Sequence, residues 1–218
     1  MIALTIDQKV VGLKENEVAN THAVFVQVAI DELIKEASFN LDDLDAVVVT
    51  LGPGSYTGLR VGLSSAKGIA YALNKPLIGL STLQLLAKHA ITQIPIYIAN
   101  KQYSKVFAAI DARRMEVFGA FYSDQDEALS NEEAYILDPA FFEYHTQNGP
   151  IVCIGSATTK IKEAFAEQPL YYIDSHYTVN EMLEMALKKF EKNQFEDLAY
   201  SAPTYIKEVY TIPSKKSL

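Results

Sequence analysis

A glycine-rich segment holds the residue types most suited to binding a charged ligand. Residues 51–62 read L-G-P-G-S-Y-T-G-L-R-V-G, between a strand expected over 46–50 and a helix expected over 57–73. Small residues before a helix N-terminus let backbone N–H groups converge on a phosphate or a carboxylate. The residues placed to do this are here called the glycine loop: Gly52, Pro53, Gly54, Ser55, Thr57 and Gly58.

The glycine loop matches neither of two common nucleotide-binding fingerprints. It lacks the Lys-Ser/Thr pair of a P-loop and the spaced glycines of a dinucleotide-binding turn. A purely structural turn therefore stands beside anion binding as an interpretation. The loop alone assigns no nucleotide.

Other residues with catalytic chemistry lack evident partners. Ser55 has the loop position of a nucleophile, but no histidine can be assigned to it as a base. His22 has Val26 where the second ligand of a helical zinc pair would stand, so we predict no metal site. Asp7 and Asp111, at expected strand ends, are the candidate bases for ATP hydrolysis. No metal-ligand spacing relates the histidines, which are His22, His89, His145 and His176.

Composition narrows the function classes. The 218 residues are 49% hydrophobic, enough to fill a core, and carry a formal net charge of −8. This charge argues against unaided binding to a polyanion such as tRNA or to an anionic membrane. Cys153 is the single cysteine, so no internal disulfide can form, and we expect a reducing, cytoplasmic location. The first residues lack an apolar signal core, and no run reaches membrane-spanning length.

The hydrophobic pattern predicts two lobes, residues 1–101 with the glycine loop and residues 102–218. In the first, strands and helices alternate in the order typical of a parallel sheet, and Thr21 is the expected N-cap of the first helix. The second opens with two long strands, 106–111 and 115–122, that are expected to form a hairpin. The other expected strands are 2–6, 9–13, 77–80, 150–154 and 171–173, and the other helices are 21–37, 81–89, 156–166 and 179–192.

The hairpin turn carries two arginines, Arg113 and Arg114. Side chains of this size would crowd a nucleotide phosphate, which argues against ATP binding there. They fit an anion or the acidic surface of a partner, and a solvated hairpin end is the simpler interpretation.

Two helices carry more apolar surface than one sheet can cover. Between residues 57 and 73 the charged residues are Arg60 and Lys67 alone, and between 23 and 30 only Gln27 is polar. A helix that is apolar nearly all round is buried on two sides. The second cover is either the other helix of the same chain or another protein.

Three stretches of the sequence closely resemble the bacterial TsaB (YeaZ) family. They are L-G-P-G-S-Y-T-G-L-R-V-G at 51–62, A-K-G-I-A-Y-A-L at 66–73 and D-A-R-R-M-E-V-F at 111–118. The resemblance implies the two-lobed α/β fold shared by actin, sugar kinases and Hsp70 chaperones, with mixed sheets flanked by helices. It also implies a role in making N6-threonylcarbamoyladenosine in tRNA.

The same resemblance implies a non-catalytic accessory subunit that binds and activates the catalytic paralogue TsaD. The ATPase TsaE would join the assembly, and tRNA would be met only through it. No cofactor is expected in the chain itself, although a nucleotide held mainly by the partners stays open. The two apolar helices would form a four-helix bundle with TsaD or, in its absence, with a second copy. The interface residues would be His22, Phe25, Val26, Ala29, Leu59, Arg60, Gly62, Leu63 and Ala66.

We expect a large charged residue at Gly62 or Leu63 to abolish this binding and leave a folded monomer.

One departure from the family concerns the start, because the usual opening strand, with its phosphate loop, is missing. Either the true start lies upstream or residues 1–13 take the vacated place in the sheet.

The alternatives to an accessory subunit are a small actin-fold ATPase or kinase, a peptidase-like protein, and a homodimeric scaffold with another task.

Overall fold

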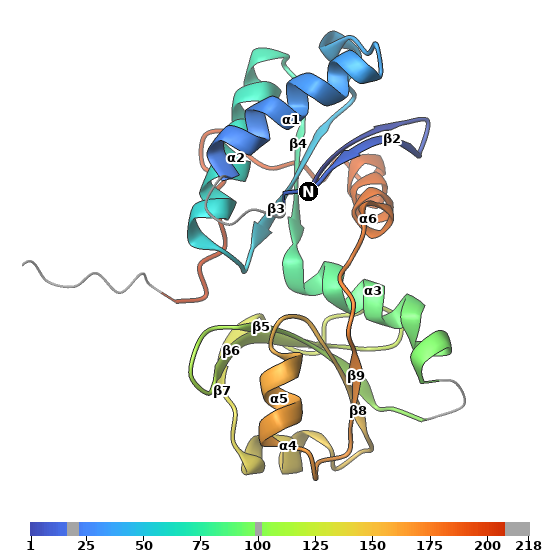
Figure 1. Ribbon diagram of the computed structural model, residues 1–218, viewed down its shortest axis with the longest axis vertical. Helices are drawn as coiled ribbons and strands as arrows, with labels where there is room; N and C mark the ends of the chain where they lie inside the picture. Colours follow the sequence, from blue (N-terminus) through green and yellow to red (C-terminus); the bar gives the residue numbers. More distant parts are fainter. Residues whose placement is uncertain (17–21, 99–101, 208–218) are drawn as a thin grey trace, which may run out of the picture.

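The structure is a computed structural model, and it describes residues 1–16, 22–98 and 102–207. Two α/β lobes lie one above the other, with one helix, α3, between them (Figure 1). The first lobe contains β1 (Ile2–Ile6), β2 (Lys9–Lys14), α1 (His22–Glu36), a 3-10 turn (Leu41–Asp43), β3 (Val47–Gly52), α2 (Tyr56–Ala72) and β4 (Leu77–Ser81). After α3 (Thr82–Tyr97), the second contains β5 (Lys105–Asp111), β6 (Glu116–Tyr122), β7 (Glu133–Ile136), α4 (Pro139–His145), β8 (Ile151–Ile154), α5 (Thr158–Ala164) and β9 (Leu170–Ile173).

The chain then returns to the first lobe through α6 (Val179–Glu191), which packs against β4. Met185 and Ala186 of α6 are buried with Ile78 and Leu80 of β4. The expected lobe division after residue 101 falls in a segment outside the described residues, as does the expected N-cap Thr21. The division after residue 101 stays a proposal. It would not include α6, which comes later in the chain and yet packs on the first lobe.

The strands of the first lobe form two separate pairs rather than one sheet. β3 and β4 run parallel, as their connection through α2 predicts, whereas β1 and β2 form an antiparallel hairpin. Asp7 and Gln8, both with positive φ, turn the second strand straight back on the first. Within the described residues β1 pairs with β2 alone, so the idea that residues 1–13 fill a place beside β3 is wrong, and so is one continuous parallel sheet.

The helix α2 buries one side against the strands. Leu63, Ala66 and Ala70 recur at helical spacing and form a buried cluster with Val49 of β3 and Leu77 of β4. The helix α1 lies against β1 and β2 and contacts α2 along its side. There, Gln27 Nε2 of α1 donates to Ser65 Oγ of α2 at 3.1 Å. The two helices therefore cover each other in part, and each keeps a solvent-exposed side.

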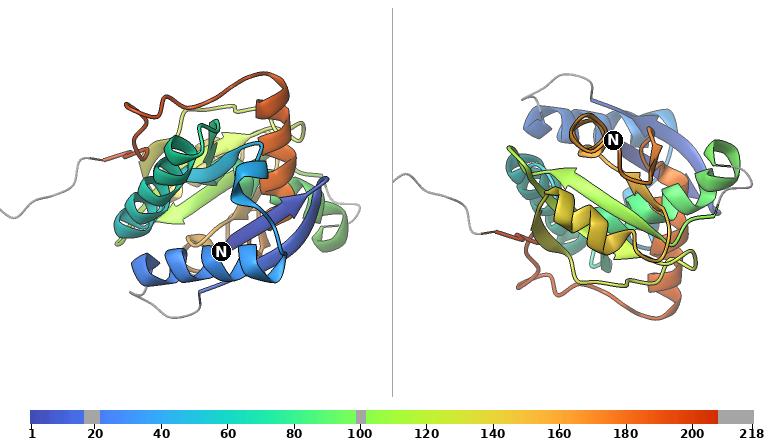
Figure 2. Two further views of the ribbon diagram at one scale, coloured as in Figure 1. Left: turned by 90° about the horizontal axis from the view of Figure 1, so that it is seen from above. Right: turned by 90° about the horizontal axis from the view of Figure 1, so that it is seen from below.

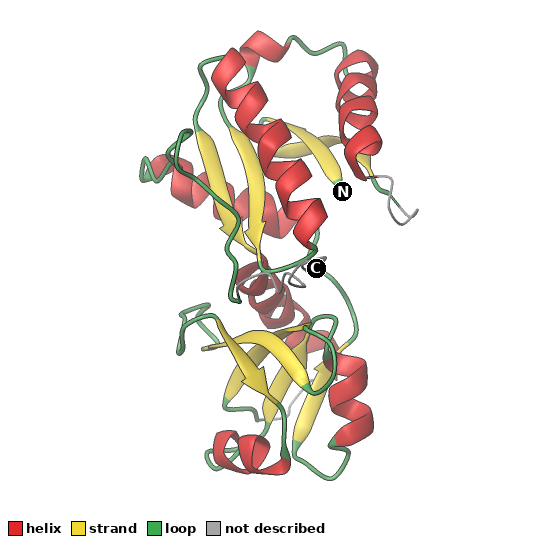
Figure 3. Ribbon diagram, turned by 90° about the vertical axis from the view of Figure 1, so that its left-hand side faces the viewer, coloured by secondary structure: helices red, strands yellow, loops and turns green. Residues whose placement is uncertain are grey.

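The second lobe is built on a five-stranded mixed sheet in the order β7-β6-β5-β8-β9. The expected hairpin of β5 and β6 is confirmed, with Val106 opposite Tyr122 and Asp111 opposite Val117. α3 covers one face of this sheet, and α4 and α5 lie on the other (Figure 3). The strand β7 and the helix α4 were not expected, because each is too short for its periodicity to stand out.

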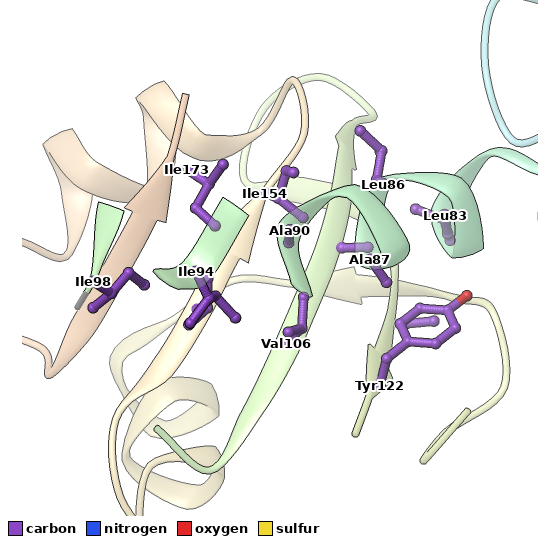
Figure 4. Packing of buried hydrophobic residues seen from close by; sticks show 13 residues of the cluster. Leu83, Leu86, Ala87, Ala90, Ile94, Ile98, Val106, Tyr122, Ile154 and Ile173 are labelled. Carbon is purple, nitrogen blue, oxygen red and sulfur yellow. The ribbon is translucent and has the colours of Figure 1, made fainter. Parts of the chain in front are cut away.

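The helix α3 runs to Tyr97, well beyond the expected end at His89. Its inner side carries Leu83, Leu86, Ala87, Ala90 and Ile94, which pack on the sheet beneath it (Figure 4). This packing extends the helix past the point where the sequence pattern alone ends it. It also fixes the second lobe to the end of β4.

Residues 193–207, here called the C-terminal strap, contain no helix or strand. They lie along the first lobe until their end, where Ile206 and Lys207 contact the second lobe. Glu196 N–H donates to Leu77 O, and Thr204 N–H donates to Leu51 O, both at 2.8 Å. Lys67 Nζ of α2 donates to the carbonyl oxygens of Ala199 and Ser201. The strap runs from α6 towards the side of the lobe where α2 lies (Figure 2, left).

Two glycine substitutions should change stability in opposite directions. Gly155 has φ +109°, and a Cβ there would lie 2.3 Å from Ala109 O, so Gly155→Ala should lower the free energy of unfolding by about 2 kcal/mol. Gly68 lies inside α2 with open space where a Cβ would stand, so Gly68→Ala should raise it by about 0.5–1 kcal/mol. Urea unfolding of both variants checks this, and equal effects would contradict the described packing.

Candidate functional site

The glycine loop and the β5–β6 hairpin face each other across an open cleft of about 470 Å³ between the lobes. The first lobe contributes Gly54, Ser55, Tyr56 and Thr57 to its wall. The second contributes Ile110, Asp111, Ala112, Arg113 and Phe118. The structure thus brings together two segments that the sequence singled out separately.

The glycine loop is shaped by close packing and by helix capping. Gly52 has φ +118°, and a Cβ there would lie 2.9 Å from Leu59 Cδ1 and 3.1 Å from Thr204 O of the strap. Ser55 is the N-cap of α2, and its Oγ accepts a hydrogen bond from Gly58 N–H at 3.3 Å. Its hydroxyl oxygen is engaged in this cap, and no histidine among the described residues is bonded to it.

Asp111, at the opposite wall, is held in an ion pair. Its Oδ1 lies 2.6 Å from Lys160 Nζ and also accepts a hydrogen bond from Arg113 N–H at 2.7 Å. The hydrogen bond from Lys160 lowers the pKa of Asp111, and the Arg113 N–H adds to this. Asp7, the other candidate base, lies in the β1–β2 turn and does not line the cleft. The two carboxylates are therefore not brought together.

A Ser–His–Glu chain that the sequence did not reveal lies where α3 meets α6. His89 Nδ1 is 2.8 Å from Glu181 Oε1, and His89 Nε2 is 2.9 Å from Ser175 Oγ. Burial raises the pKa of Glu181, but hydrogen bonds from Thr178 and His89 outweigh it and hold the pKa below its usual value. Because His89 and Glu181 are both buried, this chain fastens helices rather than meeting a substrate. Its one sequence signal is the capping box Thr178-x-x-Glu181.

Most of the side chains expected at the interface pack within the chain itself. Leu59, Leu63, Ala66 and Ala29 are buried, and a Cβ on Gly62 would contact Val49 of β3. A large charged residue at Leu63 would enter the core, so the expectation of a folded monomer with this change is wrong. The pattern misled because a sheet and a partner protein select the same apolar spacing.

The remaining interface residues are placed differently. Arg60 Nε donates to Tyr205 Oη of the strap at 3.1 Å, and its guanidinium lies over the ring of Tyr56. Phe25 and Val26 are half-buried. His22 opens α1, and its side chain lies outside what the structure describes.

A solvent-exposed surface, here called the outer helical face, lies on the other side of α1 and α2. On α2 it consists of small or uncharged residues, and Tyr71 is 80% exposed. On α1 it includes Val28, which is 50% exposed, and the ion pair of Asp31 with Lys35. Its members are Gln27, Val28, Asp31, Lys35, Ser64, Gly68, Tyr71 and Ala72.

Comparison with known proteins places this geometry in a family. The sequence model of the family described as "TsaD: tRNA N6-adenosine threonylcarbamoyltransferase" matches residues 4–217. The tRNA threonylcarbamoyladenosine biosynthesis protein TsaB of Escherichia coli is 26% identical over 193 residues, which cover 85% of this chain and 80% of that protein. The chain belongs to this family, in its TsaB (YeaZ) group.

Further relatives agree with this assignment. TsaB of Haemophilus influenzae is 38% identical over 104 residues, 47% of this chain and 41% of that protein. The structure titled "YeaZ from Pseudomonas aeruginosa" superposes with a TM-score of 0.71 at 22% identity, covering 93% of this chain and 92% of that one. The predicted fold class, a two-lobed α/β fold of the YeaZ type, is confirmed.

Two of the three stretches that carry the TsaB resemblance lie on opposite walls of the cleft, and the third, residues 66–73, lies in the second half of α2 and just beyond it. Residues 51–62 form the β3–α2 junction, and residues 111–118 form the β5–β6 hairpin. Among the described residues no helix is long and apolar enough to cross a membrane. The part of the chain that the structure describes also holds no cluster of metal-ligating side chains.

Removing the histidine of the Ser–His–Glu chain should destabilise the protein. In His89→Ala, the buried Glu181 carboxylate loses a partner, and we expect the free energy of unfolding to fall by about 2–3 kcal/mol. The matched control is His176→Ala, an exposed histidine in the same crossing segment, with an expected change below about 0.5 kcal/mol. Equal urea midpoints for the two variants would contradict a fastening role.

Proposed function

We propose that this protein is a non-catalytic accessory subunit in the biosynthesis of N6-threonylcarbamoyladenosine in tRNA. Membership of the TsaB group carries the pathway assignment, because the relatives bear that function in their names. The partnership with the catalytic paralogue TsaD follows from the same membership, since the transferase family model matches nearly the whole chain. The accessory role and the mode of binding are the finer parts of the proposal.

The state of the cleft supports a non-catalytic role. Asp111 is neutralised by Lys160, and Ser55 is engaged in capping α2. A general base needs a free lone pair within reach of the proton it removes. The ion pair with Lys160 lowers the pKa of Asp111, so its carboxylate is a weaker base than that of a free aspartate, and Ser55 has no histidine bonded to it among the described residues. The cleft therefore supports docking better than acid–base chemistry.

The outer helical face supports docking of another helical pair. The exposed residues of α2 on this face include three with small side chains, Ser64, Gly68 and Ala72. Small side chains let helices approach closely. The exposed Val28 of α1 and Tyr71 of α2 supply apolar contact area. We propose that this face forms a helical bundle with the paralogue, or with a second copy of the chain when the paralogue is absent.

The wider assembly follows from the same proposal. The ATPase TsaE joins the complex, a nucleotide at its interface is held mainly by the partners, and tRNA is bound by the complex rather than by this acidic chain alone. The protein acts in the cytoplasm. The glycine loop, in this view, sets the start of α2 and the wall of the cleft.

A drop-out reconstitution tests the proposed function. The paralogue, the ATPase and the adenylate-forming enzyme of the same source are incubated with tRNA, with this chain added or omitted. Modified nucleoside formed only when the chain is present supports the accessory role. Equal product without it contradicts the proposal, and ATP turnover by the chain alone is then the measurement to make.

Charged residues on the outer helical face should weaken binding to the paralogue. Gly68→Arg and Ser64→Arg point into solvent, so the chain should stay folded while affinity falls at least tenfold, as measured by isothermal titration calorimetry. Glu163→Arg, on the exposed side of α5 in the second lobe, is the matched control and should bind normally. Unchanged affinity in both face variants would move the interface elsewhere.

A further inference from the structure

The turn of the β5–β6 hairpin holds two arginines in an unusual backbone conformation. Arg113 has φ 73° and Arg114 has φ 50°, so two successive residues with side chains occupy the left-handed region. Hairpin turns of this kind favour Asn and Gly, because a Cβ is crowded there. Backbone strain of this kind gathers at functional sites, and it persists only where surrounding contacts enforce it.

Lys160 of α5 supplies that enforcement. Its Nζ donates to Asp111 Oδ1 at 2.6 Å, to Arg114 O at 2.9 Å and to Glu116 O at 2.7 Å. Asp111 in turn accepts the Arg113 N–H, so the turn is bound at both of its ends. The backbone that carries the two arginines is therefore fixed by a single half-buried ammonium group.

The two guanidinium groups are the free positive charges of this region. Both arginines are exposed, and neither makes an ion pair or side-chain hydrogen bond with any residue that the structure describes. The neighbouring cations are already neutralised, Lys160 by Asp111 and Lys207 by Glu116. On a chain with a net charge of −8, the hairpin tip is a local cationic spot at the rim of the cleft.

We propose that Arg113 and Arg114 contact backbone phosphates of the tRNA when it is bound by the assembled complex. This inference rests on the proposed function, which supplies the RNA. Guanidinium groups bind phosphate oxygens in pairs and are weakly hydrated, and a fixed backbone lowers the entropy lost when they do so. Two contacts on an acidic chain add to binding by the complex without making the chain an RNA-binding protein by itself.

The salt dependence of tRNA binding tests this proposal. Complexes with the paralogue are assembled from the wild-type chain and from the double variant Arg113→Ala/Arg114→Ala, and tRNA affinity is measured by fluorescence anisotropy at several salt concentrations. Because each phosphate contact contributes about 0.7–0.9 to the slope of log affinity against log salt, the variant slope should be shallower by about 1.5. The affinity of this variant at low salt should fall about tenfold or more. The affinity of the double variant Arg113→Lys/Arg114→Lys should lie between those of the wild-type and the alanine variant.

Two controls separate the outcomes. Lys162→Ala/Lys192→Ala removes two other exposed cations and should keep the wild-type slope. Gel filtration checks that every variant still joins the complex.

An unchanged slope in the arginine variant overturns the proposal. Loss of complex formation by that variant alone also overturns it, because the hairpin tip would then contact a protein. Failure of the wild-type chain to join the paralogue refutes the proposed function, and the tRNA contact falls with it.

Discussion

The junction of α3 with α6 sets the position of one lobe relative to the other. Buried His89 and Glu181 lie in contact there, and Lys88 Nζ reaches Glu184 Oε1 at 2.7 Å one turn along. Sliding the helices would leave the buried polar groups of His89 and Glu181 without partners, which is strongly unfavourable. The facing of the glycine loop and the hairpin, and with it the shape of the cleft, depends on this junction.

Within that frame, the residues with the most reactive chemistry have structural tasks. Ser55 begins a helix, and Asp111 and Lys160 together hold a turn whose arginines then point outward. The protein in this way keeps a cleft between its lobes while polar groups in the cleft walls bond to their own neighbours. Two exposed surfaces are left for binding in our proposals. The outer helical face is proposed to bind a protein, and the hairpin tip is proposed to bind a polyanion.

Sequence reasoning was most reliable where a pattern is local. The periodicities of two and 3.6 residues predicted the β5–β6 hairpin and α2 closely. They could not tell which neighbour an apolar side faces, so Leu63 was assigned to a partner although it packs on β3. The Ser–His–Glu chain joins His89 of α3 to Ser175 and Glu181, which lie 86 and 92 residues further along the chain, and the strap has no periodicity. No local signal marks either of them apart from one capping box.

The C-terminal strap has a consequence for how the chain matures. Its contacts with α2 are among the most distant in sequence, with separations of 145 positions for Arg60 and Tyr205 and 134 for Lys67 and Ser201. The ribosome releases residues 1–81 before residues 193–207, which lie along them. Because such long-range contacts close only after the intervening chain has been made, the first lobe gains these contacts only after the second lobe has been synthesised. Until then Leu77 O and Leu51 O, at strands β4 and β3, lack the hydrogen bonds that the strap donates to them.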